Sequence, residues 1–327
     1  MLYGEQQAVQ VGANEVKFRE NCAIIYKALS GKSSEHMHQE YKQFKPMNKL
    51  PVSFENQGQL AKMKEFILKF TMQSEKEVKS IVNLQKWLEN FDLKQISNQA
   101  IDELVELAEI AEEKSKIALI DLFRLLILQP TQAEYILDKH WELINVCIIG
   151  YASAQDMKDA SNKVAQNYQR ICLQFLTNVF MTEHGKEVMQ DVEKGKQIMD
   201  FCSQCLTSCN QKVQYHSALL LFNYLLCYKQ DNKKVFQSHL ELSFKHIDEL
   251  LSDKSLEDKE LMMALLLLEC RALFTNGPLC TWVEESFKLF FKGTHTELLK
   301  RTSHQDVKEA VSDVLSMLVL EDKKDKK

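Results

Sequence analysis

Residues 176–185 read LTNVFMTEHG, an apolar helical stretch that runs into a polar turn with a glycine. Four segments share this layout, each with a predicted break about seven positions after an aligned residue: Phe123 before Pro130, Asn178 before Gly185, Asn223 before Gln230 and Asp231, and Cys270 before Gly277. The aligned residues lie 55, 45 and 47 positions apart, and armadillo and HEAT repeats span roughly 40 to 47 residues. A polar, insertion-like loop at residues 151–163 accounts for the longer first interval. The pattern predicts an all-α, armadillo/HEAT-like solenoid whose inner helices line a concave groove.

The composition agrees with a helical chain. Only 9 glycines and 4 prolines occur among 327 residues, far below the roughly 12% that these two residues supply in an average soluble protein. A β-rich fold or a Rossmann-like sheet needs many more turn glycines, so both are disfavoured. With 45% hydrophobic and 27% charged residues, the chain has enough apolar surface for one large helical domain.

Charge and hydropathy exclude some partners. The net charge of −5, with no long basic stripe, does not favour nucleic acid or anionic lipid. The longest apolar stretch, residues 261–268, ends at Glu269 and is far shorter than the roughly 20 residues of a membrane span. The N-terminus lacks the basic and apolar blocks of a signal peptide, so we expect the nine cysteines in a reducing compartment, the cytoplasm or the nucleus.

Three parts are expected along the chain. Residues 1–43 are a polar extension with one short helical pattern, and residues 321–327 are a charged tail. The main domain spans residues 44–320. Its leading segment, residues 44–58, should be extended because Pro46 and Pro51 remove backbone donors and restrain the residues before them.

No motif predicts catalysis, a cofactor or a metal site. Cys202, Cys205 and Cys209 have helical i, i+3, i+7 spacing, and free cysteines on one helix face pack as small hydrophobes. A tetrahedral metal site also needs a fourth ligand, which is not found nearby at ligand spacing. The carboxylates of Glu103, Glu106 and Glu109 fit a solvated helix face. We therefore predict a non-enzymatic protein.

Arginines are few and are placed on the repeats. Only five of the 41 basic residues are arginine, and Arg124, Arg170 and Arg271 lie on or beside the predicted inner helices. The planar guanidinium binds carboxylates bidentately, so arginines along a groove suit an acidic peptide. The alternative, with about equal weight, is that each pairs with a local acid such as Asp121 or Glu269.

A polar stripe follows the same helices. Arg170, Gln174 and Asn178 are four residues apart and share one helix face, and His216 and Asn223 form a comparable stripe in the next repeat. Asparagines along a groove can hydrogen-bond the backbone of an extended peptide whatever its side chains. The competing interpretation, that these side chains cap loops or contact water, stays open.

Short stretches of the chain are similar to a known domain family. The chain resembles the PUL domain, the armadillo-like C-terminal module of phospholipase-activating protein. The similar residues are Phe44, Pro46 and the VSFE run 52–55, DLFRL at 121–125 to Pro130, NVF at 178–180 to Gly185 and Met189, residues 218–224 with Cys227, residues 265–275, and residues 311–318. The resemblance covers roughly residues 44–319 through short, dispersed matches.

The resemblance implies about six armadillo-type repeats. It also implies a groove that binds the acidic, tyrosine-containing C-terminal tail of valosin-containing protein, an AAA ATPase, which links the domain to the ubiquitin–proteasome system. Arg124, Asn178, Asn223 and Tyr224 match the family pattern by position. With Arg170, Gln174, His216 and Arg271 from the stripes above, they make up the predicted peptide-binding groove.

Two departures from the family favour a second hypothesis. Where the family tends to have an arginine one turn before the asparagine, this chain has Gln174, and where it has a basic residue in the fifth repeat, this chain has Leu265. Each charge-assisted bond contributes roughly 1.5 to 3 kcal/mol, so the loss of two cations weakens or abolishes tail binding. Residues 1–43 are also too few for the family's usual companion domains, so ubiquitin binding and peptidase activity are not inferred. The alternative function is a structural scaffold within a large, for example cytoskeletal, assembly.

Overall fold

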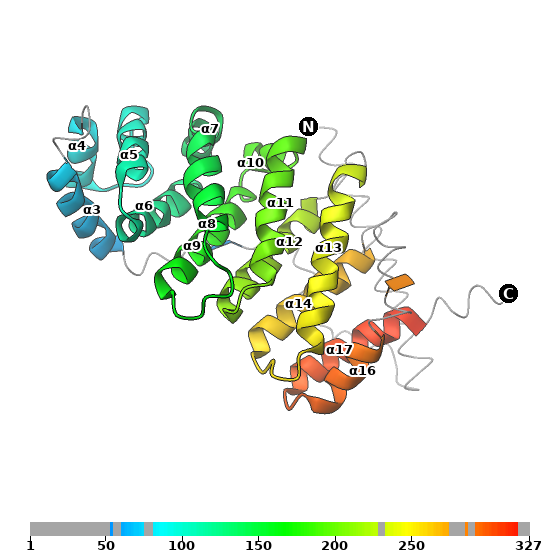
Figure 1. Cartoon of the computed structure of the whole chain (residues 1–327). Helices are drawn as coiled ribbons and strands as arrows, with labels where there is room; N and C mark the ends of the chain where they lie inside the picture. Colours follow the sequence, from blue (N-terminus) through cyan, green and yellow to red (C-terminus); the bar gives the residue numbers. More distant parts are fainter. Residues whose placement is uncertain are drawn as a thin grey trace, which may run out of the picture.

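The computed structural model describes residues 53–54, 60–74, 81–227, 233–274, 285–286 and 292–319. Within these ranges every regular element is a helix. The helices follow one another in chain order across the molecule, from α3 at one end to α17 at the other (Figure 1). The fold is therefore an all-α solenoid, as the sequence predicts. The extension at residues 1–43 and the tail at 321–327 lie outside the described residues.

An inner layer of helices carries the predicted repeats. It consists of α3 (Leu60–Ser74), α6 (Glu113–Leu126), α9 (Lys163–Val179), α12 (Gln211–Cys227), α14 (Lys259–Phe274) and α17 (Gln305–Val319). Each of these helices packs against the next one in this series. Contacts between successive repeats are the defining feature of a solenoid, because no repeat can bury its apolar face alone.

An outer layer packs against the inner one. It consists of α4 (Val82–Asn90), α5 (Asn98–Ile110), α7 (Pro130–Lys139), the π-helix η3 (Leu143–Gly150), α8 (Tyr151–Ser153), α10 (Glu183–Met189), α11 (Val192–Leu206), α13 (Lys233–Ser252) and α16 (Lys292–Arg301). Neighbouring helices of this layer also contact one another: α7 packs against α10, and α11 packs against α13. One hydrophobic cluster runs between the layers, from Met63 in α3 to Val314 in α17.

The inner helices are enclosed on most of their circumference. On α12 the run from Val213 to Leu225 is buried apart from Tyr215. A helix that is apolar on all sides belongs in the interior of a large fold, since a surface helix needs one polar face. Polar residues that interrupt such a helix must therefore have hydrogen-bond partners.

Two of the predicted breaks, Pro130 and Gly185, are among the described residues, whereas Gln230 and Gly277 lie outside them. Pro130 is the first residue of α7, a position where its missing N–H costs nothing. Gly185, in contrast, lies inside α10, and α9 already ends at Val179. A Cβ on Gly185 would lie 1.9 Å from the carbonyl oxygen of Val179. This glycine is thus required for close helix packing and does not end a helix, so the prediction that it is a breaker is wrong.

The predicted polar loop at residues 151–163 is only partly a loop. Its first three residues form α8, which directly continues the π-helix. The connection then ends at Asn162, whose side chain accepts a hydrogen bond from the Ala165 N–H and caps α9.

Glu103 does not lie on a solvated face, contrary to the sequence prediction. It is buried, and its carboxylate caps the start of α4 from the neighbouring helix α5. Its Oε2 accepts a hydrogen bond from the Leu84 N–H at 2.6 Å, and its Oε1 accepts one from Asn83 Nδ2 at 2.8 Å. A carboxylate at this position satisfies N–H groups that have no partner within α4.

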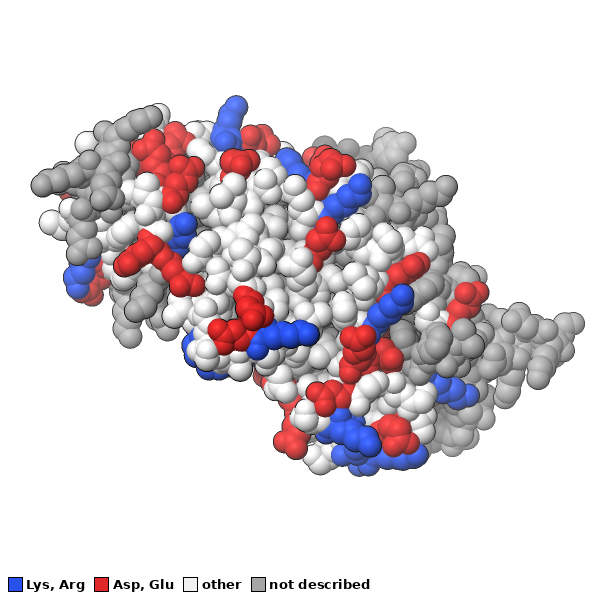
Figure 2. Space-filling model, viewed as in Figure 1, with Lys and Arg blue, Asp and Glu red and all other residues white. Residues whose placement is uncertain are grey.

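Charged side chains of both signs are interspersed on the face seen in Figure 2, and no basic stripe runs across that face. Many of these charges form local pairs, such as Lys186 with Glu183 and Lys300 with Glu297. None of the described helices combines the length and the hydrophobicity that a bilayer span requires.

Candidate functional site

The centre of the candidate site is Asn178, near the end of α9. Its side-chain Nδ2 donates to the carbonyl oxygen of Arg124 at 2.8 Å and to that of Phe54 at 3.0 Å. Its Oδ1 accepts a hydrogen bond from the Phe54 N–H at 2.6 Å. The amide thus pairs with both backbone groups of Phe54, as a neighbouring strand would. Asn178 is completely buried, so its amide group is fixed in this orientation.

One of these bonds satisfies the end of a helix. Arg124 lies in the last turn of α6, where carbonyl groups lack an intrahelical partner. The Phe123, Leu125 and Leu126 carbonyls of that turn accept from the N–H groups of residues 127–129. The Arg124 carbonyl accepts from Asn178 instead, so Asn178 caps α6 as well as binding Phe54.

The Arg124 side chain reaches the same backbone. Its Nη1 donates to the Phe54 carbonyl oxygen, which therefore accepts from both Arg124 and Asn178. Its Nε donates to Asp121 Oδ1 at 2.6 Å, one turn earlier on α6. Arg124 thus pairs with a local acid, as the alternative interpretation has it, and it also binds the Phe54 backbone. Its binding of an acidic peptide stays a prediction.

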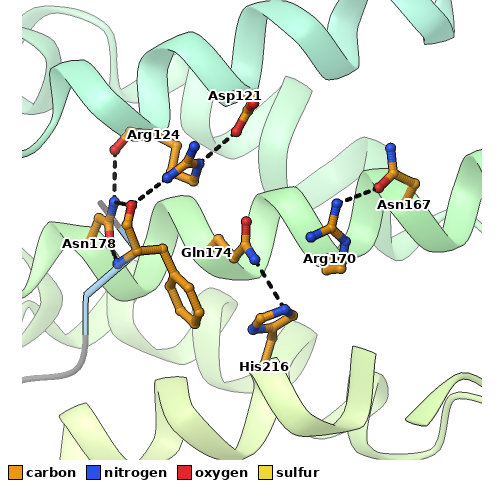
Figure 3. Close-up of polar contacts among 8 residues, drawn as sticks. Asp121, Arg124, Asn167, Arg170, Gln174, Asn178 and His216 are labelled. Carbon is orange, nitrogen blue, oxygen red and sulfur yellow. Dashed lines mark hydrogen bonds and ion pairs between the residues drawn. The ribbon is translucent and has the colours of Figure 1, made fainter. Parts of the chain in front are cut away.

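The Phe54 side chain lies against α12. Its ring is edge-on to the His216 ring, with centroids 4.7 Å apart and an interplanar angle of 79°. Gln174 Nε2 lies 3.1 Å from His216 Nε2 and orients that ring (Figure 3). We call Phe54, Arg124, Gln174, Asn178 and His216 the Phe54 site.

His216 is neutral at physiological pH. Burial, followed by the charges of Arg170 and Lys212, lowers the pKa of His216 to about 3. Because the Gln174 amide donates to Nε2, the ring proton is on Nδ1, which is buried and has no hydrogen-bond partner among the described residues. The ring therefore presents a neutral aromatic surface to Phe54.

Two cationic side chains, those of Arg170 and Lys212, lie near this neutral ring. Arg170 is half-buried one turn before Gln174 on α9, and its Nη2 donates to Asn167 Oδ1 at 2.7 Å (Figure 3). Burial lowers the pKa of Arg170, and the charge of Asp121 opposes that shift while that of Arg124 adds to it. Lys212 is exposed near the start of α12. Arg170 and Lys212 therefore supply positive charge beside the Phe54 site. Glu260 and Asp258 supply negative charge near the neighbouring Tyr215, where they add to the effect of burial in raising its pKa.

The other predicted groove residues lie elsewhere. Asn223 is completely buried, and its Nδ2 donates to the Thr177 carbonyl at 3.2 Å. Tyr224 is buried too, with its hydroxyl 3.7 Å from the sulfur of Met189, and burial raises its pKa well above the ordinary value. Arg271 is partly buried on α14, and burial lowers its pKa. A peptide-binding role for these three residues stays a prediction.

Sequence analysis predicted an extended leading segment, of which the structure describes residues 53–54, but it missed the contacts of Phe54 with Arg124, Asn178 and His216. The sequence offered one signal, an aromatic residue inside a proline-containing extended segment. Lys212 was also missed, since one lysine among many has no distinguishing pattern.

The three cysteines are divided between a buried helix face and an exposed position. Cys202 and Cys205 are buried on α11, and burial raises the pKa of Cys202 to about 12. Cys209 is exposed and lies beyond the end of that helix, so the prediction that the three share one helical face is wrong for Cys209. Across the described ranges, no group of three or more histidine, cysteine or acidic residues has metal-binding geometry.

One comparison with known proteins is informative. The sequence model of the PUL domain matches residues 48–267, about two-thirds of the chain. The matched range contains all five residues of the Phe54 site together with Arg170, Asn223 and Tyr224, while Arg271 lies just beyond it. No curated protein matches the chain.

Proposed function

The chain belongs to the PUL domain family of protein-interaction domains, and on this premise we propose that it is a non-enzymatic adaptor that binds an acidic, extended peptide at the Phe54 site. The domain would span residues 44–320, with residues 1–43 and 321–327 as its flanks. We place the adaptor in the cytoplasm.

The observation that carries this proposal is the pairing of Asn178 with the backbone of Phe54. One buried amide binds both the N–H and the C=O of a single extended residue. Because these contacts use the backbone alone, they suit any extended peptide. Recognition of extended segments by main-chain hydrogen bonds is a recurrent mode of peptide binding.

The charges beside the site support an acidic ligand. Arg170 and Lys212 both act on His216 with positive charge, and Arg124, which pairs with Asp121, contacts the Phe54 carbonyl. A cationic surface attracts an acidic peptide and speeds its association. Family resemblance makes the acidic C-terminal tail of valosin-containing protein the favoured ligand, with a link to the ubiquitin–proteasome pathway.

Calorimetry with this tail peptide and the full chain tests the proposal. We expect measurable binding that weakens as salt rises, and at least tenfold weaker binding to Arg170→Glu. Lys300→Glu is the matched control, because it makes the same charge change on α16, where Lys300 is exposed and pairs with Glu297. Absence of binding at millimolar peptide, or equal binding to wild type and Arg170→Glu, contradicts the proposal.

A second candidate function is a structural scaffold that has lost tail binding. Gln174 stands where the family tends to have an arginine, and its amide group is already bound to His216. Leu265 stands where the family has a basic residue, and it is completely buried in α14. Both replacements remove a cation from the inner helices.

The scaffold alternative has its own test. If the chain is a fixed component of a large assembly, gel filtration of cell extract will recover it in a high-molecular-weight fraction that high salt does not dissolve. A chain that elutes as an exchangeable monomer contradicts the scaffold alternative and leaves the adaptor.

A further inference from the structure

We propose that the outward face of α3 is the surface through which two copies of this chain bind each other. The two α3 helices lie antiparallel across a twofold axis at the level of Ile67, and each Glu65 faces Lys69 of the other copy. This contact is independent of the proposed function, because α6, α9 and α12 supply the residues that surround Phe54.

The face lies at one end of the solenoid. In the described part of the chain, α3 is the first of the inner helices (Figure 1). It packs against α6, the next inner helix, and against α4. The terminal repeats of a solenoid need a polar outer face to stay soluble. Apolar side chains on the outer face of an end helix therefore indicate an interaction surface.

Three apolar side chains of α3 are exposed. The exposed fractions are 39% for Phe66, 37% for Leu68 and 65% for Met72. Ile67, between the first two, is completely buried and marks the side of the helix that faces the core. Successive residues are about 100° apart around a helix, so Phe66 and Leu68 lie on opposite flanks of Ile67, and Met72 lies one turn beyond Leu68. The apolar residues thus border the outward side of α3.

Glu65 and Lys69 occupy the middle of this outward side. Each is two residues from Ile67 and therefore about 160° away from it around the helix. Lys69 Nζ donates to Glu65 Oε1 at 2.7 Å, and the two side chains are 69% and 67% exposed. A carboxylate accepts several hydrogen bonds and an ammonium group donates three, so this pair can bind a second such pair.

The order of these residues is self-complementary in one orientation. A twofold axis perpendicular to α3 at Ile67 places Glu65 opposite Lys69 of the other copy, and it places Phe66 and Leu68 each beside the same residue of that copy. A twofold contact uses the same patch on both subunits. Parallel helices would place Glu65 against Glu65, and like charges at an interface repel each other. The charges therefore select the antiparallel arrangement.

A contact between two single helices should be weak. α3 has 15 residues, so each copy contributes about four helical turns. Small interfaces are typical of transient complexes. We expect a reversible dimer with a dissociation constant of about 50 μM. Salt should weaken the dimer, because the opposing charges are exposed.

Sedimentation equilibrium of the full chain tests the inference, with circular dichroism to show that each variant is folded. Glu65→Lys and Lys69→Glu should each weaken self-association more than about tenfold, because like charges then face each other. Mixed in equal amounts, the two variants should form a heterodimer about as tight as the wild-type dimer, because every opposing pair is again of opposite sign. Charges that act only within one helix give no such mutual rescue.

Two controls match these variants. Glu297→Lys makes the same charge change in an exposed pair, that with Lys300 on α16, and should leave the dimer unchanged. Leu68→Gln should weaken the dimer about tenfold, since it removes an apolar side chain from both copies. Leu242→Gln changes an exposed leucine of α13 and should have no effect on the dimer.

Three results overturn the inference. One is a wild-type chain that stays monomeric up to about 0.5 mM, which leaves the face to a different protein or to another segment of this chain. Another is equal self-association of wild type and folded Glu65→Lys. The third is a mixture of the two charge variants that does not associate. If a single variant does not fold, the exchanged variant Glu65→Lys/Lys69→Glu decides: it keeps every pair, so it must dimerise as wild type does.

Discussion

Two asparagines at corresponding positions of successive repeats, Asn178 and Asn223, differ in the backbone groups with which they form hydrogen bonds. Each is completely buried, and each donates from Nδ2 to a carbonyl in the last turn of the preceding inner helix. Those carbonyls belong to Arg124 in α6 and Thr177 in α9. Asn178 additionally binds the N–H and the carbonyl of Phe54.

The comparison separates a helix cap that both asparagines provide from a contact with the Phe54 backbone that Asn178 makes. Capping of the preceding helix is common to both asparagines, because the carbonyls at a helix end need donors wherever one repeat packs on the next. Binding of a backbone is added at Asn178, where an extended segment passes the same amide. The helix cap is therefore common to both asparagines, and the contact with Phe54 belongs to Asn178.

Alanine at either asparagine gives the largest expected effect. Asn178→Ala removes three hydrogen bonds and should lower the free energy of unfolding by about 3 kcal/mol, and Asn223→Ala by about 2 kcal/mol. Urea denaturation followed by circular dichroism measures both. Only Asn178→Ala should also release Phe54, seen as faster amide exchange at that residue. Equal release in both variants contradicts the distinction between the two asparagines.

Acid should weaken the Asn178 region through His216. The pKa of His216 is about 3 in the folded protein and about 6.5 in an unfolded chain. Below pH 6.5 the unfolded chain binds a proton that the folded chain does not, so stability falls by about 1.4 kcal/mol per pH unit until about pH 3. The loss between pH 7.5 and 4.5 should be about 2.5 kcal/mol smaller in His216→Gln, measured by urea denaturation. An identical loss in the variant contradicts this assignment.

Double-mutant cycles sharpen the comparison further. Phe54→Ala and Asn178→Ala remove the same hydrogen-bonded contact, so their effects on the free energy of unfolding should couple by about 1 kcal/mol. Phe54→Ala and Asn223→Ala should be additive to within about 0.3 kcal/mol, because Asn223 binds the Thr177 carbonyl. A comparable coupling in both cycles would show that Phe54 acts on the whole inner layer.

The smallest expected effect concerns the exposed charge beside the site. Lys212→Glu should weaken an acidic peptide about threefold at low salt, through lost attraction. Stability should stay equal or rise by about 0.5 kcal/mol, because a carboxylate in the first turn of α12 is favourable. Calorimetry and thermal melting test the two parts, with Lys300→Glu as the control for charge. An unchanged affinity would place the ligand away from α12.

The sequence was sufficient to predict the helical repeats but not where the helices of each repeat end. Apolar runs such as residues 218–227 predict buried helices because few polar residues interrupt them. The role of Gly185 was predicted wrongly, because glycine occurs both as a helix breaker and as a residue that permits close packing. Only the tertiary contact distinguishes these roles, because a Cβ added at Gly185 would lie 1.9 Å from the Val179 carbonyl oxygen. The exposure of Glu103 was predicted wrongly for a similar reason, because its burial depends on where the neighbouring helix α4 begins.

The site was predictable only in part. Spacing along α9 placed Arg170, Gln174 and Asn178 on one face, and three residues of this stripe and its neighbour do come together with Phe54. Asn223 and Tyr224 shared the family pattern equally, but their contacts are with Thr177 and Met189. A sequence pattern fixes the face of a helix but not which neighbours cover that face.

By itself the sequence determined the fold class, the repeat spacing and the family, because helix periodicity and the scarcity of breakers act over short distances along the chain. Tertiary structure alone decided that Asn178 holds Phe54, 124 residues away, while Asn223 holds Thr177. Those partners depend on how one repeat is stacked on the next and on where residues 53–54 lie against α6 and α9. The same amide can bind whichever backbone the packing brings within about 3 Å, so its role is set by its surroundings.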